Sequence, residues 1–194
     1  LSQLEAKFKK PLVIKSLSGT DFFKHISSFY SENSDKSEDI ADGHAIWRET
    51  VYNITGLPSE LTSPTQFIRI GAPNITLNGN NNTVNVGVTD YPGFVQNGKY
   101  IPTNELQNII AQPGFTIRNL TVDGTKGRLS DTGGWVCQEY FGYKNLGGST
   151  LTVENCYSSG NIEGVNAGGI CGQWAGYNGG NVNIYNCYTT GDIS

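Results

Sequence analysis

Four cysteines, in two pairs at matching positions of a repeated segment, are the residues of this chain most able to do chemistry. The pairs are Cys137 with Cys171 and Cys156 with Cys187. Stacked repeats would bring paired Cα atoms to about 5 Å, which is within disulfide range. Parallel side chains disfavour the disulfide dihedral, and a reduced cysteine packs well as a small buried hydrophobe. Inter-repeat disulfides and reduced core thiols both remain open, and the geometry favours thiols.

Carboxylates and histidines form no recognisable catalytic pattern. The best acidic pair is Asp123 with Asp131, but seven residues separate them and nothing in the sequence sets their distance. His25 and His44 have no nucleophile beside them, and the acidic stretch 35–42 lacks the spacing of a preformed calcium loop. There is no CxxC motif for zinc. We therefore predict no catalytic residue, no metal and no cofactor.

Aromatic residues gather around two Gly-Gly-apolar-Cys runs, at 133–137 and 168–171. Trp135 is expected in the core, because it adjoins Val136. Flat exposed rings suit stacking on sugars or contact with a protein. A weak aromatic binding face is accordingly predicted from four residues: Tyr140, Tyr143, Trp174 and Tyr177.

Composition narrows the function classes further. Only 15% of the residues are charged, 25 are glycine, and the net charge is −4. Such a composition is typical of an all-β protein with many tight turns. The sequence lacks the clustered Lys and Arg that nucleic-acid binding requires, and no apolar run reaches the roughly 18 residues of a membrane span. We expect neither a nucleic-acid partner nor a membrane span.

The elements that position these residues come from a repeat. The segment 155–162 (NCYSSGNI) recurs 31 residues later at 186–193 (NCYTTGDI), and a degenerate copy begins at Asn119. Short alternating strands with turns at fixed offsets bury their apolar face by stacking, about 4.8 Å apart. Stacking would align Asn119, Asn155 and Asn186 in an amide ladder, since asparagine tolerates the left-handed turn conformation.

Strands are predicted at 45–54, 67–70, 74–86 and 115–122, and within each repeat. The Asn-Gly turn inside 74–86 fits either a hairpin or a corner between successive faces. Residues 87–113 read as an excursion loop. We expect residues 1–44 to form a separate mixed segment that caps or docks, with a strand near Val13 and a helix over 21–29. The β region 45–194 is expected to continue beyond Ser194.

Two motifs carry a resemblance, which covers roughly residues 65–194. The runs 168–172 (GGICG) and 186–193 (NCYTTGDI) are similar to the GLUG-type repeats of bacterial surface proteins, and the cysteine-containing version to repeats of large DNA viruses. The segment 74–84 (ITLNGNNNTV after Asn74) resembles the opening of right-handed parallel β-helix proteins, with Asn78 where Asp is usual and Asn82 where His is usual.

The resemblance implies a right-handed parallel β-helix, a solenoid whose repeats stack. It also implies a structural role at a surface, either capsid-associated in a virion or in a cell-surface fibre, with partners among the structural proteins of the same assembly. A glycan-binding adhesin module is the first alternative, and a polysaccharide lyase or glycoside hydrolase is the second.

Overall fold

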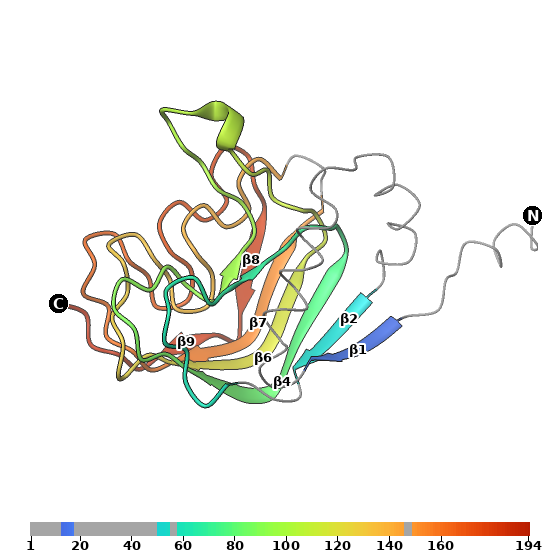
Figure 1. Ribbon diagram of the computed structural model, residues 1–194. Helices are drawn as coiled ribbons and strands as arrows, with labels where there is room; N and C mark the ends of the chain where they lie inside the picture. Colours follow the sequence, from blue (N-terminus) through green and yellow to red (C-terminus); the bar gives the residue numbers. More distant parts are fainter. Residues whose placement is uncertain (1–12, 18–49, 55–57, 146–148) are drawn as a thin grey trace, which may run out of the picture.

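The protein is an all-β chain built from parallel strands. A computed structural model describes residues 13–17, 50–54, 58–145 and 149–194 (Figure 1). The one helix in this described part is the short 3₁₀ turn η1, Glu105–Gln107. No helix among the described residues is therefore long and apolar enough to cross a membrane.

Every pass of the chain adds one strand to the same parallel sheet. The spatial order is β1-β2-β4-β6-β7-β8, with β9 also pairing with β7. Figure 1 shows these strands side by side along one side of the molecule, in the order in which they occur in the sequence. Their bounds are Val13–Leu17, Thr50–Ile54, Ile75–Asn85, Thr116–Asp123, Leu151–Ser158, Val182–Tyr185 and, for β9, Tyr188–Thr189.

A second set of parallel pairings runs beside the main sheet. Strand β3, Ile68–Arg69, pairs with β5, Val95–Gln96. Single parallel bridges then continue from Val95 to Cys137 and from Cys137 to Cys171. The chain therefore passes the same two positions repeatedly, which brings segments some 30–40 residues apart in sequence into contact.

The Asn-Gly segment within β4 is a corner and not a hairpin. Residues 75–85 form one continuous strand that pairs in parallel with β2 and β6. The register shifts between Asn78 and Asn82, where Asn80 and Asn81 adopt left-handed φ angles of 54° and 58°. Two left-handed residues bend the strand without reversing it, so that pairing resumes in the same direction.

The prediction that residues 87–113 form an excursion is wrong for the first half of that range. Tyr91 and Val95 are fully buried and bridge to later passes of the chain. The excursion is limited to a protrusion closed by reciprocal backbone hydrogen bonds between Lys99 and Ile109, at whose tip η1 lies (Figure 1). Proline and glycine content alone did not separate a buried turn from an exposed loop.

The core lies between the two sets of strands, and alternation in each strand supplies it. The buried positions of β6 include Ile117, Leu120 and Val122, and those of β7 include Val153, Cys156 and Ser158. These residues pair in register across the two strands. Strand β1 adds Val13–Leu17 to the outer edge of the sheet beside β2. The predicted helix 21–29 lies outside the described residues.

Candidate functional site

Two corner segments, 137–144 and 171–178, stack directly on one another. The backbone N–H of Tyr140 donates to the Gln173 carbonyl (2.9 Å), that of Gly176 to Phe141 (2.8 Å) and that of Lys144 to Tyr177 (3.2 Å). Tyr140 and Trp174 share the left-handed conformation, with φ of 56° and 57°. Because the two turns have the same shape, aromatic residues at matching positions lie beside each other.

Five rings form a continuous aromatic cluster at this corner, comprising Tyr100, Tyr140, Tyr143, Trp174 and Tyr177. The ring centroids of Tyr140 and Trp174 are 4.8 Å apart, and those of Tyr143 and Tyr177 are 6.0 Å apart and nearly parallel. Tyr100 lies 5.3 Å from Tyr143 and 5.6 Å from Tyr177. Contacts at these separations are favourable for aromatic pairs and hold the rings in place.

The predicted binding face is only partly exposed. Trp174 and Tyr177 keep 50% and 42% of their surface, whereas Tyr140 and Tyr143 keep 4% and 1%. The expectation that all four are exposed is therefore wrong for Tyr140 and Tyr143, which support the two outer rings. Tyr100 was not predicted, because it lies in the segment interpreted as an excursion. Trp135 is fully buried, and this confirms its place in the core.

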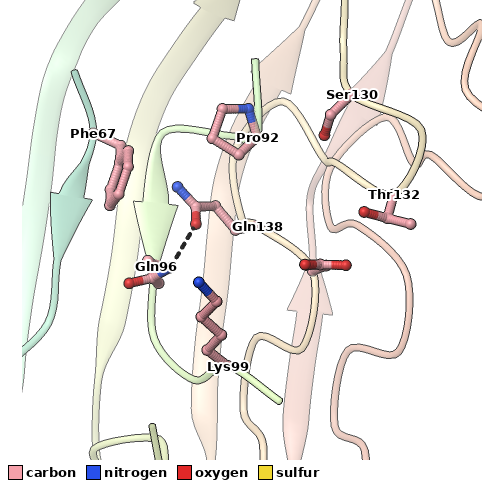
Figure 2. A pocket seen from close by; sticks show the side chains of 8 residues that line it. Phe67, Pro92, Gln96, Lys99, Ser130, Thr132 and Gln138 are labelled. Carbon is pink, nitrogen blue, oxygen red and sulfur yellow. Dashed lines mark hydrogen bonds between the residues drawn. The ribbon is translucent and has the colours of Figure 1, made fainter. Parts of the chain in front are cut away.

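A polar cleft of about 190 Å³ is lined by Lys99 and Glu139, which directly precede Tyr100 and Tyr140 of the aromatic cluster in the sequence (Figure 2). At its floor the side chain of Gln138 is buried, accepts a hydrogen bond from Gln96 (2.9 Å) and donates one to the Gly93 carbonyl (2.9 Å). The other lining residues are Phe67, Pro92, Lys99, Ser130, Thr132 and Glu139. None of them was singled out from the sequence, since three separate passes of the chain supply them.

The asparagine column is a hydrogen-bonded ladder of side-chain amides from Asn53 to Asn155, whereas the predicted member Asn186 makes no side-chain hydrogen bond to Asn155. Asn155 donates to Asn119 (3.2 Å), Asn119 to Asn78 (3.0 Å) and Asn78 to Asn53 (2.8 Å). Asn119, Asn155 and Asn186 all have left-handed φ angles, between 50° and 56°. At Asn119 and Asn155 the conformation shifts the alternation of the strand, so that the residue after the asparagine (Leu120, Cys156) is buried, as is the residue two places before it (Ile117, Val153). Asn53 and Asn78 belong to the ladder but were not predicted.

All four cysteines lie in the described part of the chain, and each is a free thiol. Cys137 and Cys171 are bridge neighbours, and the backbone N–H of Cys156 donates to the Cys187 sulfur at 3.4 Å. Burial raises the pKa of the Cys137 thiol well above its usual value. Hydrogen bonding from Cys156 lowers the pKa of Cys187, which is only partly buried. The reactive thiolate form is therefore favoured more at Cys187 than at Cys137.

Cys187 is expected to be alkylated faster than Cys137 in the folded protein at neutral pH. The thiolate is the reactive form, so a lowered pKa moves the rise of the alkylation rate to lower pH than for an ordinary cysteine. Iodoacetamide labelling followed by peptide mass spectrometry, repeated at several pH values, measures this order. In denaturant the four rates should converge. Equal native rates for Cys187 and Cys137 would contradict the assignment.

The acidic residues are occupied structurally or dispersed. Asp123 accepts hydrogen bonds from the Thr125 backbone (3.0 Å), the Thr125 hydroxyl (2.7 Å) and the Ser159 hydroxyl (3.0 Å). The bonds from Thr125 are the main reason that the pKa of Asp123 is lowered. No group of three or more potential metal ligands occurs among the described residues. His25, His44 and the acidic stretch 35–42 lie outside them.

Comparison of the chain with protein-family models, with curated proteins and with solved structures found no match.

Proposed function

We propose that this chain is a right-handed parallel β-helix that serves as a structural component of a surface assembly, either capsid-associated in a virion or in a cell-surface fibre. The observation that carries the proposal is the strand register. Each pass adds a parallel strand at the same edge, and equivalent residues such as Asn119 and Asn155 lie side by side. Stacked repeats of this kind give stiff, extended bodies with broad contact surfaces. The role is mechanical and not catalytic.

The surface proposed for protein–protein contact is the open edge of the stack at strands β8 and β9. Ile184, Tyr185 and Tyr188 keep between 46% and 57% of their surface there. Within the described residues, β8 is the last strand of the sheet order and has an unpaired edge. Exposed apolar side chains beside free strand N–H and C=O groups favour the addition of another β element. Structural proteins of the same assembly are the proposed partners, whether they add to this edge directly or contact the stack after a further repeat of this chain has covered the edge.

Cryo-electron microscopy of the native particle or envelope tests this role. We expect an ordered parallel-stranded body with Ile184 and Tyr188 covered by a neighbouring subunit. A complementary measurement is cross-linking mass spectrometry on intact particles, which should link the β8 region to another structural protein. Particles that consistently lack the protein, or a body bound to no neighbour, would contradict the proposal.

A second candidate function, a glycan-binding module, is favoured by one specific observation. The exposed rings of Trp174 and Tyr177 occur in a fold that also holds a polar cleft, where the Lys99 and Glu139 side chains have no hydrogen-bond or ion-pair partner among the described residues. Apolar faces of sugar rings stack on exposed aromatic rings, while their hydroxyls need hydrogen-bond partners. The two functions are compatible, because β8 and the aromatic corner present different residues.

A further inference from the structure

The polar cleft and the aromatic cluster are built from adjoining residues of the same stacked segments. Lys99 lines the cleft, and the next residue, Tyr100, belongs to the aromatic cluster. In the same way Glu139 lines the cleft and the next residue, Tyr140, belongs to the cluster. The segment 171–178 is also tied to the cleft. The backbone N–H of Gln173, the residue before Trp174, donates to the carbonyl of the cleft residue Thr132. The cleft residues are thus joined to the rings that support Trp174 and Tyr177, the two exposed members of the cluster.

The cleft holds one cation and one anion that are not paired with each other. The described ion pairs join Lys126 to Glu60 and Arg128 to Glu163, and neither involves Lys99 or Glu139. Within the described residues, the Lys99 ammonium donates no hydrogen bond and the Glu139 carboxylate accepts none. Gln96 uses its amide nitrogen for Gln138, which leaves its carbonyl oxygen as an acceptor (Figure 2). The floor is rigid because Gln138 is buried and bonded at both ends of its amide.

We propose that this surface binds a neutral saccharide, with one sugar unit in the cleft and a neighbouring unit stacked on Trp174 and Tyr177. The proposal deepens the second candidate function and rests on it. Sugar hydroxyls both donate and accept, so they match an ammonium, a carboxylate, an amide and the hydroxyls of Ser130 and Thr132 at the same time. Each charged group gains hydrogen bonds from the hydroxyls without needing a charged ligand.

The size and charge of the cleft narrow the ligand class. Its volume of about 190 Å³ lies below the roughly 300–1,000 Å³ of pockets for drug-sized ligands, so it fits one small unit of a longer chain. The charges of Lys99 and Glu139 balance within the cleft. With one charge of each sign, the cleft gives an acidic sugar no net electrostatic attraction, because attraction to Lys99 is offset by repulsion from Glu139. A neutral hexose chain needs no such attraction.

Isothermal titration calorimetry of the full chain against neutral and acidic oligosaccharides tests the proposal. We expect saturable binding of at least one neutral oligosaccharide, weakened about tenfold or more by Trp174→Ala and by Glu139→Gln, since each removes a central contact. Matched controls are Tyr188→Ala, an exposed ring on the main sheet, and Glu163→Gln, an acidic residue outside the cleft. Both controls should bind as the unaltered chain does.

Three results would overturn it. They are the absence of saturable binding by any neutral oligosaccharide, binding by acidic oligosaccharides alone, and binding that Trp174→Ala and Glu139→Gln leave unchanged. Circular dichroism of each variant verifies that the fold is retained, and Lys99→Gln provides a second cleft variant if Glu139→Gln fails to fold. Failure of saccharide binding would leave the assembly role unaffected, because that role is measured on native particles through the β8 surface.

Discussion

Replacement of Trp135 by alanine is expected to lower the free energy of unfolding by about 3–5 kcal/mol. The indole is fully buried, and its N–H donates to the Gly160 carbonyl at 2.9 Å. Its ring packs over Gly124 and Gly160, where any Cβ would overlap it, and lies 6.5 Å from the ring of Tyr91. The truncation leaves a large cavity and a buried carbonyl without its donor. Urea unfolding, with the midpoint and the m-value both measured, gives the change.

Trp174→Ala is the matched control for this prediction. It removes the same side chain from a half-exposed position, where the indole contacts Tyr140 and Tyr177. The expected loss is about 1–2 kcal/mol, because two half-exposed aromatic contacts are lost and no cavity forms. Equal losses in the two variants would show that Trp135 does not anchor the core. A reciprocal variant, Gly160→Ala, should cost about 1–3 kcal/mol, because the added methyl group displaces the indole.

Asn119→Ala is expected to cost about 2–4 kcal/mol, the second largest effect. The substitution removes the amide that donates to Asn78 and accepts from Asn155, and each such bond contributes about 0.5–1.5 kcal/mol. It also places an alanine at φ 56°, where residues other than glycine and asparagine lose about 1–2 kcal/mol. Chemical denaturation against the unaltered chain measures the sum.

Asn119→Gly separates the two causes. Glycine adopts the left-handed conformation freely, so this variant loses the ladder and keeps the backbone, with an expected cost of about 1–2 kcal/mol. Asn183→Ala, at an exposed asparagine of β8, should change stability by less than about 0.5 kcal/mol. If Asn119→Ala and Asn119→Gly cost the same, the left-handed conformation is not a source of the effect.

The two predictions concern the features that keep the passes of the chain in register. The ladder ties four strands together through side chains on one side of the sheet, and Trp135 fills the space against two stacked turns. A body held at both places is stiff, which suits a structural component and also fixes the aromatic cluster relative to the cleft. Stability and the proposed binding surface thus depend on the same stacking.

Local features of the sequence determined much of this architecture. The strands Ile68–Arg69, Thr116–Asp123 and Leu151–Ser158 follow from alternation, which depends only on neighbouring residues. The all-β class follows from composition in the same way. The left-handed asparagines 119, 155 and 186 were also foreseeable, because asparagine tolerates that conformation through its own side chain.

Only the tertiary structure decided which residues meet. Tyr140 and Tyr143 are buried because Tyr100 and the next corner cover them, and nothing near these tyrosines in sequence indicates that cover. The cleft depends likewise on bringing Lys99 beside Glu139, which are 40 residues apart. The register of β4 against β6 includes a shift that alternation alone does not predict. Alternation sets which side of a strand is buried. The lengths of the intervening turns set which residues of successive strands become neighbours, and this effect arises only when the strands stack.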